Sequence, residues 1–377
     1  MAVRLADVAE EAGVSQSTAS RVLNGSARRP KPEIAERVRA AAERLGYFPN
    51  AQAQALARSS AGLIGLIVHD IADPYFSSIA RGAQRGLSGS GVQLMLASTE
   101  REAQAEAEAV RAFMSYRTDA ILLAGSRGFD DDAVLQEVLD TYRANGGRAA
   151  MIGQPLPNAG GIRIDNEGGS AALAEELLKA GHRRFAVLSG EPELSTAVQR
   201  TEGFVGKLRS AGVPPEVVLQ GAFTREGGYL MMQELLVSGA VEARTPRKSG
   251  ERAPAGGGSL ESPHTAGTRP AGGESSRGSD GAPLCVFCVN DVMALGALAA
   301  IREAGLRVPE EIAVAGFDDI PTLADQHPSI TTVRLPLEEV GRLSAEMLLK
   351  NGDAEHRLVV EGTPVLRGST RLTGRGV

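Results

Sequence analysis

Residues 8–24 read VAEEAGVSQSTASRVLN and set two short helical patterns on either side of one glycine. Small and aliphatic side chains recur at helical spacing over about 5–11 and again after residue 15. Gly13 permits a tight turn between them because it has no Cβ. Ser15 is a good N-cap for the second helix. The stretch therefore predicts two helices joined by a tight turn, the second of which carries an unusually polar surface.

A third helical pattern, over 33–45, completes a small N-terminal head. Its apolar face comprises Ile34, Val38, Ala41, Ala42 and Leu45. Gly46 supplies the C-terminal stop, and Pro49 prevents continuation. Residues 50–59 (NAQAQALARS) then form a short, nearly uncharged helical pattern of their own.

From residue 63 the pattern alternates between strands and helices. The apolar runs are LIGLIV (63–68), VQLMLAS (92–98), AILLAG (120–125), AAMIG (149–153), FAVLSG (185–190), VVLQG (217–221), CVFCV (285–289) and IAVAGF (312–317). Short, continuously apolar strands that alternate with amphipathic helices are typical of buried parallel sheets in an α/β fold. About 300 residues is large for one sheet, so we expect two α/β lobes.

One segment, residues 240–283, interrupts this pattern. It holds nine Gly, five Pro and six Ser, and its only aliphatic side chains larger than alanine are Val241 and Leu260. Such a composition buries too little apolar area to offset the entropy of ordering. We therefore predict a disordered surface insertion within the body of the protein.

The composition favours a soluble globular protein in a reducing, cytoplasmic location. The chain is 42% hydrophobic, and no apolar run approaches the ~20 residues of a membrane span. The N-terminus has acidic residues and no apolar segment of the kind found in signal peptides. Cys285 and Cys288 lie three apart in one predicted strand and point to opposite faces, so we interpret them as structural thiols.

The net charge of −6 is unevenly distributed. Residues 1–60 hold nine Lys/Arg and six acidic residues, whereas the remaining chain holds 31 basic and 40 acidic groups. A basic head on an acidic body is typical of a nucleic-acid-binding module joined to another domain.

Several ordered motifs resemble the LacI/GalR (lactose-repressor/galactose-repressor) family of bacterial transcription regulators. They are LADVAEEAGVSQSTASRVLNG (5–25), ERVRAAAERLGYFPNAQAQALA (36–57), DPYFSSIARGAQRGL (73–87), NDVMALGALAAIREAGLRVPEEIAVAGFDD (290–319) and PSITTVRLP (328–336). The resemblance implies a helix-turn-helix DNA-binding domain over 1–48 and a hinge helix with linker over 49–61. It also implies a two-lobed effector-binding and dimerisation domain over 62–377, similar to periplasmic binding proteins.

By this resemblance the second helix of the head enters the major groove of DNA. Gln16, Ser17 and Arg21 are then the predicted base-reading residues, since Gln bonds adenine and Arg bonds guanine. The predicted backbone contacts or caps are Ser15, Thr18, Ser20 and Asn24. In the hinge, Asn50 also belongs to the DNA-binding set, and Leu56 stands where the family wedges a leucine into the central base step. The alternative for Leu56 is an ordinary core leucine.

The family binds its effector at the carboxyl ends of the strands of two sheets. Residues at such positions are Asp73, Tyr75, Phe76, Ser126, Arg127, Arg200, Phe223, Asn290, Asp291 and Asp318. Carboxylates, amides and arginine suit sugar hydroxyls, and aromatic rings suit the apolar face of a sugar. The alternatives remain open that Tyr75 and Phe76 are core residues, that Arg127 is solvated, and that Asp318 and Asp319 cap a turn.

Two departures from the family pattern bear on DNA binding. Arg4 and Ile34 replace hydroxyl residues that family members commonly use for phosphate contacts. Arg4, Arg28, Arg29 and Lys31 offer electrostatic replacement, so we expect operator affinity to be more salt-dependent than it is with hydroxyl contacts.

The function that we expect is a homodimeric repressor of a palindromic operator, with a small-molecule effector, most simply a sugar, and no cofactor. The five histidines show no metal-ligand spacing, and no nucleophile motif or phosphate-binding loop is present, so we expect no enzyme. The rival interpretations are a sugar-binding protein without a DNA role and an α/β sugar-metabolising enzyme. The identity of the effector is left open by the sequence.

Overall fold

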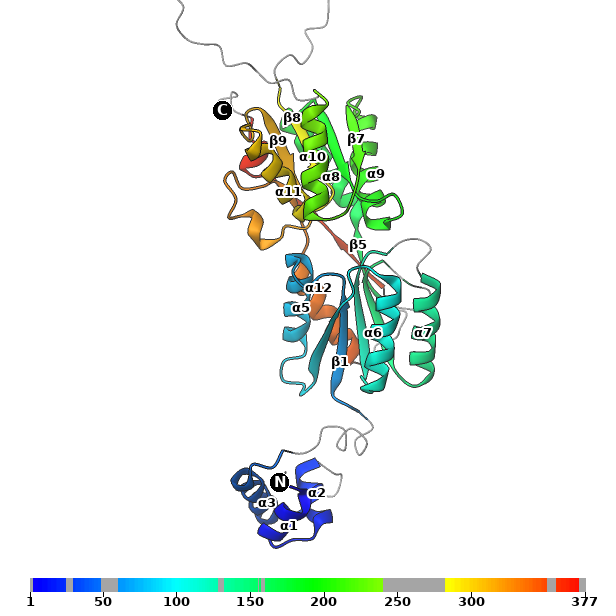
Figure 1. Cartoon of the computed structure of the whole chain (residues 1–377), viewed down its shortest axis with the longest axis vertical. Helices are drawn as coiled ribbons and strands as arrows, with labels where there is room; N and C mark the ends of the chain where they lie inside the picture. The colour runs from blue at the N-terminus through cyan, green and yellow to red at the C-terminus, as the bar shows by residue number, and fades with distance from the viewer. Residues whose placement is uncertain are drawn as a thin grey trace, which may run out of the picture. The chain divides into compact units, whose positions relative to one another are not determined.

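The computed structural model describes residues 3–24, 30–48, 60–127, 132–154, 156, 160–239, 282–350 and 357–372. The chain forms two compact units, which are Met1–Ile164 with Pro336–Val360 and Asp165–Leu335 with Glu361–Val377 (Figure 1). The predicted hinge residues Asn50 and Leu56, and the predicted insertion apart from residues 282–283, lie outside the described residues.

The head consists of helices α1 (Leu5–Glu11), α2 (Gln16–Asn24) and α3 (Pro32–Leu45), as the sequence predicts to within one residue. Its small core comprises Val8, Ala9, Ala12, Ala19, Val38, Ala41 and Ala42. Gly13 (φ +62°) and Gly46 (φ +64°) both adopt the left-handed backbone conformation. Glycine adopts this conformation without strain, and it commonly follows the last residue of a helix. Small side chains on all three helices let their axes approach closely, which fixes the orientation of α2.

The first unit is built on a sheet with strand order β11-β5-β4-β3-β1-β2. Its strands are β1 (Leu63–Val68), β2 (Gln93–Ser98), β3 (Ala120–Gly125), β4 (Arg148–Gly153), β5 (Gly160–Asp165) and β11 (Arg357–Glu361). Parallel pairing joins β2 to β1, β1 to β3, β3 to β4 and β4 to β5. Every residue of β3 is buried, which explains why its sequence is apolar throughout.

Two pairs of helices cover the two faces of this sheet. Helices α5 (Pro74–Gly86) and α12 (Leu337–Leu349) lie on one face, and α6 (Ala103–Ser115) and α7 (Asp132–Ala144) lie on the other (Figure 1). Helices α5 and α12 touch backbone to backbone, because a Cβ on Gly82 would lie 1.9 Å from the Glu338 carbonyl oxygen. A Cβ on Gly341 would likewise lie 2.1 Å from the Ile79 carbonyl oxygen.

The second unit has a parallel sheet with strand order β7-β6-β8-β9. Its strands are β6 (Phe185–Ser189), β7 (Val217–Gln220), β8 (Leu284–Cys288) and β9 (Ile312–Ala315). Helix α8 (Asn166–Lys179) packs on α9 (Ser195–Ser210), and α10 (Arg225–Val237) packs on α11 (Asp291–Glu303). Right-handed crossovers place α9 on the opposite face of the sheet from α10 and α11. The unit is closed by β10 (Thr332–Arg334), which pairs antiparallel with β12 (Thr363–Val365), and by the short helices η1 (Pro321–Leu323) and η2 (Gly368–Thr370).

All eight predicted strands are present, with ends that differ by at most two residues, and the α/β prediction is confirmed. Cys285 and Cys288 are buried and unpaired in β8, and burial raises the pKa of both thiols. The sequence did not reveal β5, β10, β11 or β12. Among the described residues, no helix is both long and apolar enough to span a bilayer.

Candidate functional site

The polar start of α2 is organised around Ser15. Its Oγ accepts the Thr18 N–H at 3.2 Å, which confirms the predicted N-cap, and lies 2.8 Å from the Thr18 Oγ1. The same Oγ lies 3.0 Å from the Ser17 Oγ. Ser17, predicted to read bases, therefore shares its hydroxyl with the cap in the free protein. One turn further on, the Asn24 amide donates to the Ser20 Oγ at 3.0 Å.

Gln16 and Arg21 differ from these hydroxyl residues. Both are exposed, and neither side chain has a hydrogen-bond or ion-pair partner in the described part of the chain. Their amide and guanidinium groups are thus available to an external ligand. Of the exposed side chains on α2, these two can contact a base edge bidentately.

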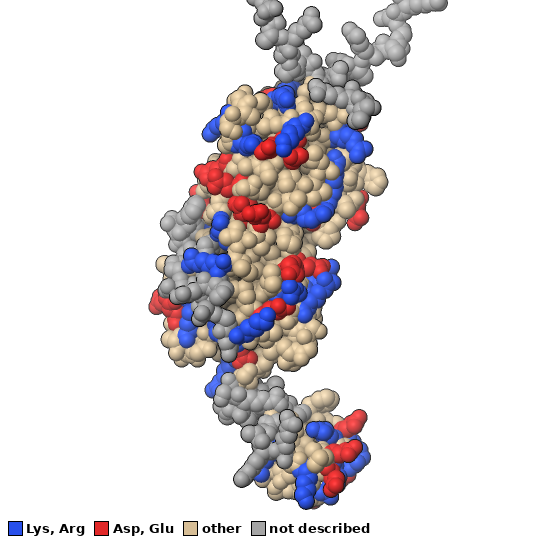
Figure 2. Space-filling view, turned by 180° about the vertical axis from the view of Figure 1, so that it is seen from behind, with Lys and Arg blue, Asp and Glu red and all other residues tan. Residues whose placement is uncertain are grey.

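The surface charge of the head is mixed. The described residues of the head carry six Lys/Arg and six Asp/Glu, whereas Arg28, Arg29 and Arg58 lie outside them. Figure 2 shows both signs on its visible face. Arg4 does not cap α1 through its side chain. Instead its backbone N–H donates to the Asp7 carboxylate at 2.8 Å. Ile34 is half-buried against the head core, so its aliphatic side chain serves packing.

In the second unit, Arg200 of α9 is the centre of a buried polar cluster. Its Nη2 donates to Asp318 Oδ1 at 2.8 Å, and its Nε donates to Asn166 Oδ1 at 2.9 Å. Its Nη1 donates to the Val289 carbonyl oxygen at 2.9 Å. The guanidinium also lies 3.9 Å from the centre of the Phe317 ring, where cation–π attraction adds to the ion pair. Arg200 is only 3% exposed, so these contacts fix its position firmly.

Asp291, at the start of α11, is fully buried beside this cluster. Its Oδ2 accepts the Ile320 N–H at 2.9 Å, and its Oδ1 accepts the Thr332 hydroxyl at 2.7 Å. Burial raises the pKa of Asp291 well above its ordinary value, and the nearby Asp318 carboxylate raises it further. The neighbouring Asn290 caps α11 by accepting the Met293 N–H at 2.8 Å.

The side chain of Arg200, which follows β6 in the chain, reaches the residues beyond the carboxyl ends of β8 and β9, where Asn290, Asp291 and Asp318 lie. Asp318 and Asp319 both have positive φ (119° and 58°), a conformation unusual for non-glycine residues. Neither caps a helix. Asp319 instead pairs with Arg334 and Arg367, each at 2.6 Å. Phe223 lies nearly buried after β7, where its N–H donates to the Glu191 carboxylate at 3.1 Å.

Sequence reasoning missed three members of this cluster, namely Asn166, Phe317 and Thr332. Asn166 follows β5, which was not predicted. Phe317 ends the apolar run 312–317, where its sequence suggests only a core residue, and Thr332 lies in a strand of only three residues.

In the first unit, the predicted effector-binding residues form two groups. Asp73, Tyr75 and Phe76 follow β1, and Ser126 and Arg127 follow β3. Asp73 caps α5 by accepting the Tyr75 N–H at 2.9 Å. Phe76 is 5% exposed and packs edge-on against Tyr75 and His69, so it belongs to the core as much as to any site. Arg127 is buried rather than solvated, because its backbone N–H and its guanidinium both donate to Gln154. Ser126 is buried beside it.

His69 and Glu106 form a buried pair that the sequence did not predict. His69 Nε2 lies 3.1 Å from Glu106 Oε1, and both side chains are at most 4% exposed. Gly125 makes room for the imidazole, since a Cβ there would lie 2.3 Å from His69 Cε1. Burial lowers the pKa of His69. The contact with Glu106 opposes this shift only in part, and Arg101 and Arg127 add to it.

The lowered pKa of His69 predicts an acid-dependent loss of stability. A histidine with a depressed folded pKa contributes stability above its unfolded pKa of about 6.5, and that stability is lost as the pH falls below this value. We expect His69→Gln, whose amide still reaches Glu106, to lose less stability than the wild type between pH 7 and pH 5. The free energies of unfolding of the two proteins should diverge by at most about 1.4 kcal/mol for each pH unit. Urea titrations at several pH values measure it.

The exposed His327→Gln is the matched control for this measurement and should follow the wild-type curve. If His69→Gln and the wild type had parallel pH profiles, the buried histidine would not be the source of the acid sensitivity.

No group of three or more His, Cys, Asp or Glu side chains among the described residues is placed to hold a metal ion. What the structure does present is an exposed polar helix on the head and two buried, hydrogen-bonded polar sets at the carboxyl ends of parallel strands. These features define a helix-turn-helix protein with a body of the periplasmic-binding-protein type.

Comparison with known proteins supports this class in each part of the chain. Residues 4–50 match "Bacterial regulatory proteins, lacI family". Residues 61–244 match "Periplasmic binding proteins and sugar binding domain of LacI family", and residues 174–370 match "Periplasmic binding protein-like domain".

Full-length relatives identify the family. The ribose operon repressor of Haemophilus influenzae is 30% identical over 370 residues, which cover 96% of this chain and 97% of that protein. The HTH-type transcriptional repressor CytR of Escherichia coli K12 is 29% identical over 98% of this chain and 97% of its own length. The chain belongs to the LacI family of bacterial regulatory proteins.

Two solved structures share the fold. The lac repressor dimer bound to operator and the anti-inducer ONPF has a TM-score of 0.77 and 24% identity, with 98% of this chain and 99% of that chain covered. A complex of the transcriptional regulator CelR with cellobiose has a TM-score of 0.63 and 28% identity, with 97% and 99% covered.

Proposed function

We propose that this protein is a dimeric transcriptional repressor that binds a palindromic operator and responds to a small-molecule effector. The observation that carries the DNA-binding part is the exposure of Gln16 and Arg21 on α2, within a three-helix head that matches the lacI family. Helix α2 then inserts into the major groove, and the Ser15 cap holds its first turn toward the phosphate backbone.

The effector is a sugar or a sugar-like molecule. Arg200, Asn290, Asp291 and Asp318 supply amide, guanidinium and carboxylate groups in one cluster, which suits a ring bearing several hydroxyls. Tyr75, Phe76 and Phe223 supply aromatic surface, and Asp73, Ser126 and Arg127 supply further polar groups. The relatives named for ribose and cellobiose support this class of ligand.

The effector changes DNA affinity only by its differential affinity for the conformations of the protein. The buried cluster around Arg200 is suited to such discrimination, because its hydrogen bonds leave few alternative arrangements. Whether the effector induces or co-represses depends on which conformation it favours.

Alanine substitutions on α2 test the DNA-binding part. We expect Gln16→Ala and Arg21→Ala each to lose about 1–3 kcal/mol of operator binding and to relax base preference at one position per half-site. Thr18→Ala, which removes a hydroxyl beside the cap, should instead weaken binding to all sequences alike. Footprinting and gel shifts on operator variants measure both effects.

The division of roles is wrong if all three variants lose affinity without any change in base preference. The proposal of a DNA-binding repressor itself fails if the wild-type protein protects no palindromic sequence upstream of its own gene, with or without sugars.

A further inference from the structure

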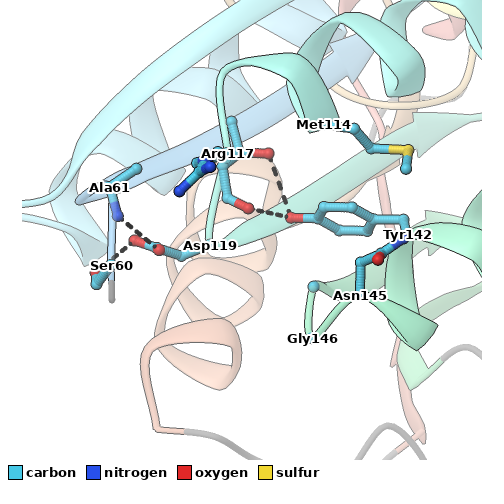
Figure 3. Close-up of a pocket in the computed structure, with 10 residues that line it drawn as sticks. Ser60, Ala61, Met114, Arg117, Asp119, Tyr142, Asn145 and Gly146 are labelled. Carbon is cyan, nitrogen blue, oxygen red and sulfur yellow. Dashed lines mark hydrogen bonds between the residues drawn. The ribbon is translucent and has the colours of Figure 1, made fainter. Parts of the chain in front are cut away.

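A cavity of about 620 Å³ lies at the amino-terminal edge of the sheet of the first unit (Figure 3). This is the opposite edge from the one that bears His69, Ser126 and Arg127. Its walls are residues 60–61 before β1, residues 117–119 before β3, the ends of α6 and α7, and the turn 145–147 before β4. Ligand pockets commonly measure about 300–1,000 Å³, so the volume suits a small organic molecule. The function proposed above makes no use of it.

Most polar groups in the wall are already engaged. The Asp119 carboxylate accepts the Ser60 hydroxyl at 2.8 Å and the N–H groups of Ala61 at 2.9 Å and Gly62 at 2.8 Å. Tyr142 donates its hydroxyl to the Thr118 carbonyl oxygen at 2.7 Å, and burial raises the pKa of Tyr142 to about 12. The Asp119 and Tyr142 side chains are therefore held by hydrogen bonds within the protein and shape the wall of the cavity.

Arg117 differs from the rest of the wall. Its backbone adopts the left-handed conformation (φ +56°), and its side chain is exposed. Within the part of the chain that the structure describes, its guanidinium has no hydrogen-bond or ion-pair partner. In Figure 3 the nitrogens of Arg117 lie toward Ala61 and Asp119, whereas Met114 and Tyr142 lie on the other side of the same cavity. The cavity therefore has a cation on one side and a thioether and a phenol ring on the other.

We propose that this cavity binds a small organic carboxylate that carries an apolar ring or chain. The carboxylate pairs with the Arg117 guanidinium, whose planar fork of donors matches a carboxylate. The apolar part packs against Met114 and Tyr142. Asp119 is the acidic side chain in the wall, and its negative charge is directed to the hydroxyl and N–H donors of residues 60–63 rather than to the cavity.

Benzoate and its neutral counterpart benzamide test the proposal on the full chain. The protein has eight methionines, and Met114 lines the cavity, so ¹³C-methyl labelling of methionine gives a local probe. We expect benzoate to shift the Met114 signal in a saturable manner and benzamide to shift it at least about tenfold less effectively. The signal of Met293, which lies in the second unit, is the internal control. It should not follow the benzoate concentration as the Met114 signal does.

Substitutions at Arg117 locate the binding energy. Arg117→Asn removes the charge but tolerates the left-handed backbone, and it should weaken benzoate binding about tenfold or more. Arg117→Lys should retain part of the affinity. Arg111→Asn, at an exposed site on α6 outside the cavity wall, is the matched control and should bind as the wild type does.

Three results would each overturn the proposal. They are no Met114 shift with benzoate up to its solubility limit, equal binding of benzamide, and equal weakening by the Arg117 and Arg111 substitutions. Because every readout is local to the first unit and independent of DNA, failure here leaves the repressor proposal untouched.

Discussion

Gly82→Ala should lower the free energy of unfolding of the first unit by about 3 kcal/mol, among the largest effects of any single methyl group in this protein. The added Cβ would lie 1.9 Å from the Glu338 carbonyl oxygen and 2.8 Å from the Glu338 Cα. Backbone atoms cannot rotate away as a side chain does, so α5 and α12 must separate. The chain has no tryptophan, so urea denaturation followed by circular dichroism is the suitable measurement.

Gly206→Ala in α9 is the matched control. A Cβ on Gly206 meets nothing within 4 Å, so alanine adds helix propensity without a clash and should stabilise by about 0.5–1 kcal/mol. Opposite signs for the same substitution would confirm the close approach of α5 and α12. A Gly82→Ala protein as stable as the wild type would show that the two helices have room between them.

Arg200→Met should lower the free energy of unfolding by about 3–5 kcal/mol and abolish the response to effector. The substitution preserves much of the side-chain volume but removes the cation that pairs with buried Asp318 and bonds Asn166. In thermal-shift measurements against sugars and nucleobases, a ligand that raises the Tm of the wild type should leave that of Arg200→Met unchanged.

Two further proteins separate the loss of charge from the loss of packing. Arg184→Met breaks the ion pair with Glu216 at the surface of the same unit, where the side chains are 27% and 38% exposed, and should cost less than about 1 kcal/mol. Adding Asp318→Asn to Arg200→Met should recover part of the stability, because the charge that Arg200 neutralises at position 318 is then also removed. Equal losses for Arg184→Met and Arg200→Met would contradict the importance of burial.

The parts of the fold that could be predicted are those in which burial imposes an apolar run. β1 and β3 are buried along nearly their whole length, so LIGLIV and AILLAG indicate strands with the correct ends. β11 is an edge strand with exposed Leu358 and Val359, and β5 contains two glycines and an exposed Arg163. Neither has the continuous apolar pattern of a central strand, which is why both were missed.

Single residues of the candidate site could be predicted from the sequence wherever the end of a strand could be predicted. Arg200 and Asp318 are 118 positions apart, and each was identified separately because it follows an apolar strand or stands in a motif next to one. Their pairing, and the stacking of Arg200 on Phe317, depend on how β6, β8 and β9 are ordered in the sheet. Pairwise contacts of this kind require the tertiary fold. The burial of His69 against Glu106 belongs to the same class.

A ribosome that has made the first 335 residues has completed neither compact unit. The first unit still lacks α12, against which Gly82 packs, and the second still lacks Ser369, whose hydroxyl donates to the Val314 carbonyl oxygen at 2.6 Å. Domains built from continuous stretches of chain can fold one after another during synthesis. Here both units need segments that follow residue 335, so a premature stop before α12 would deprive both of contacts at once.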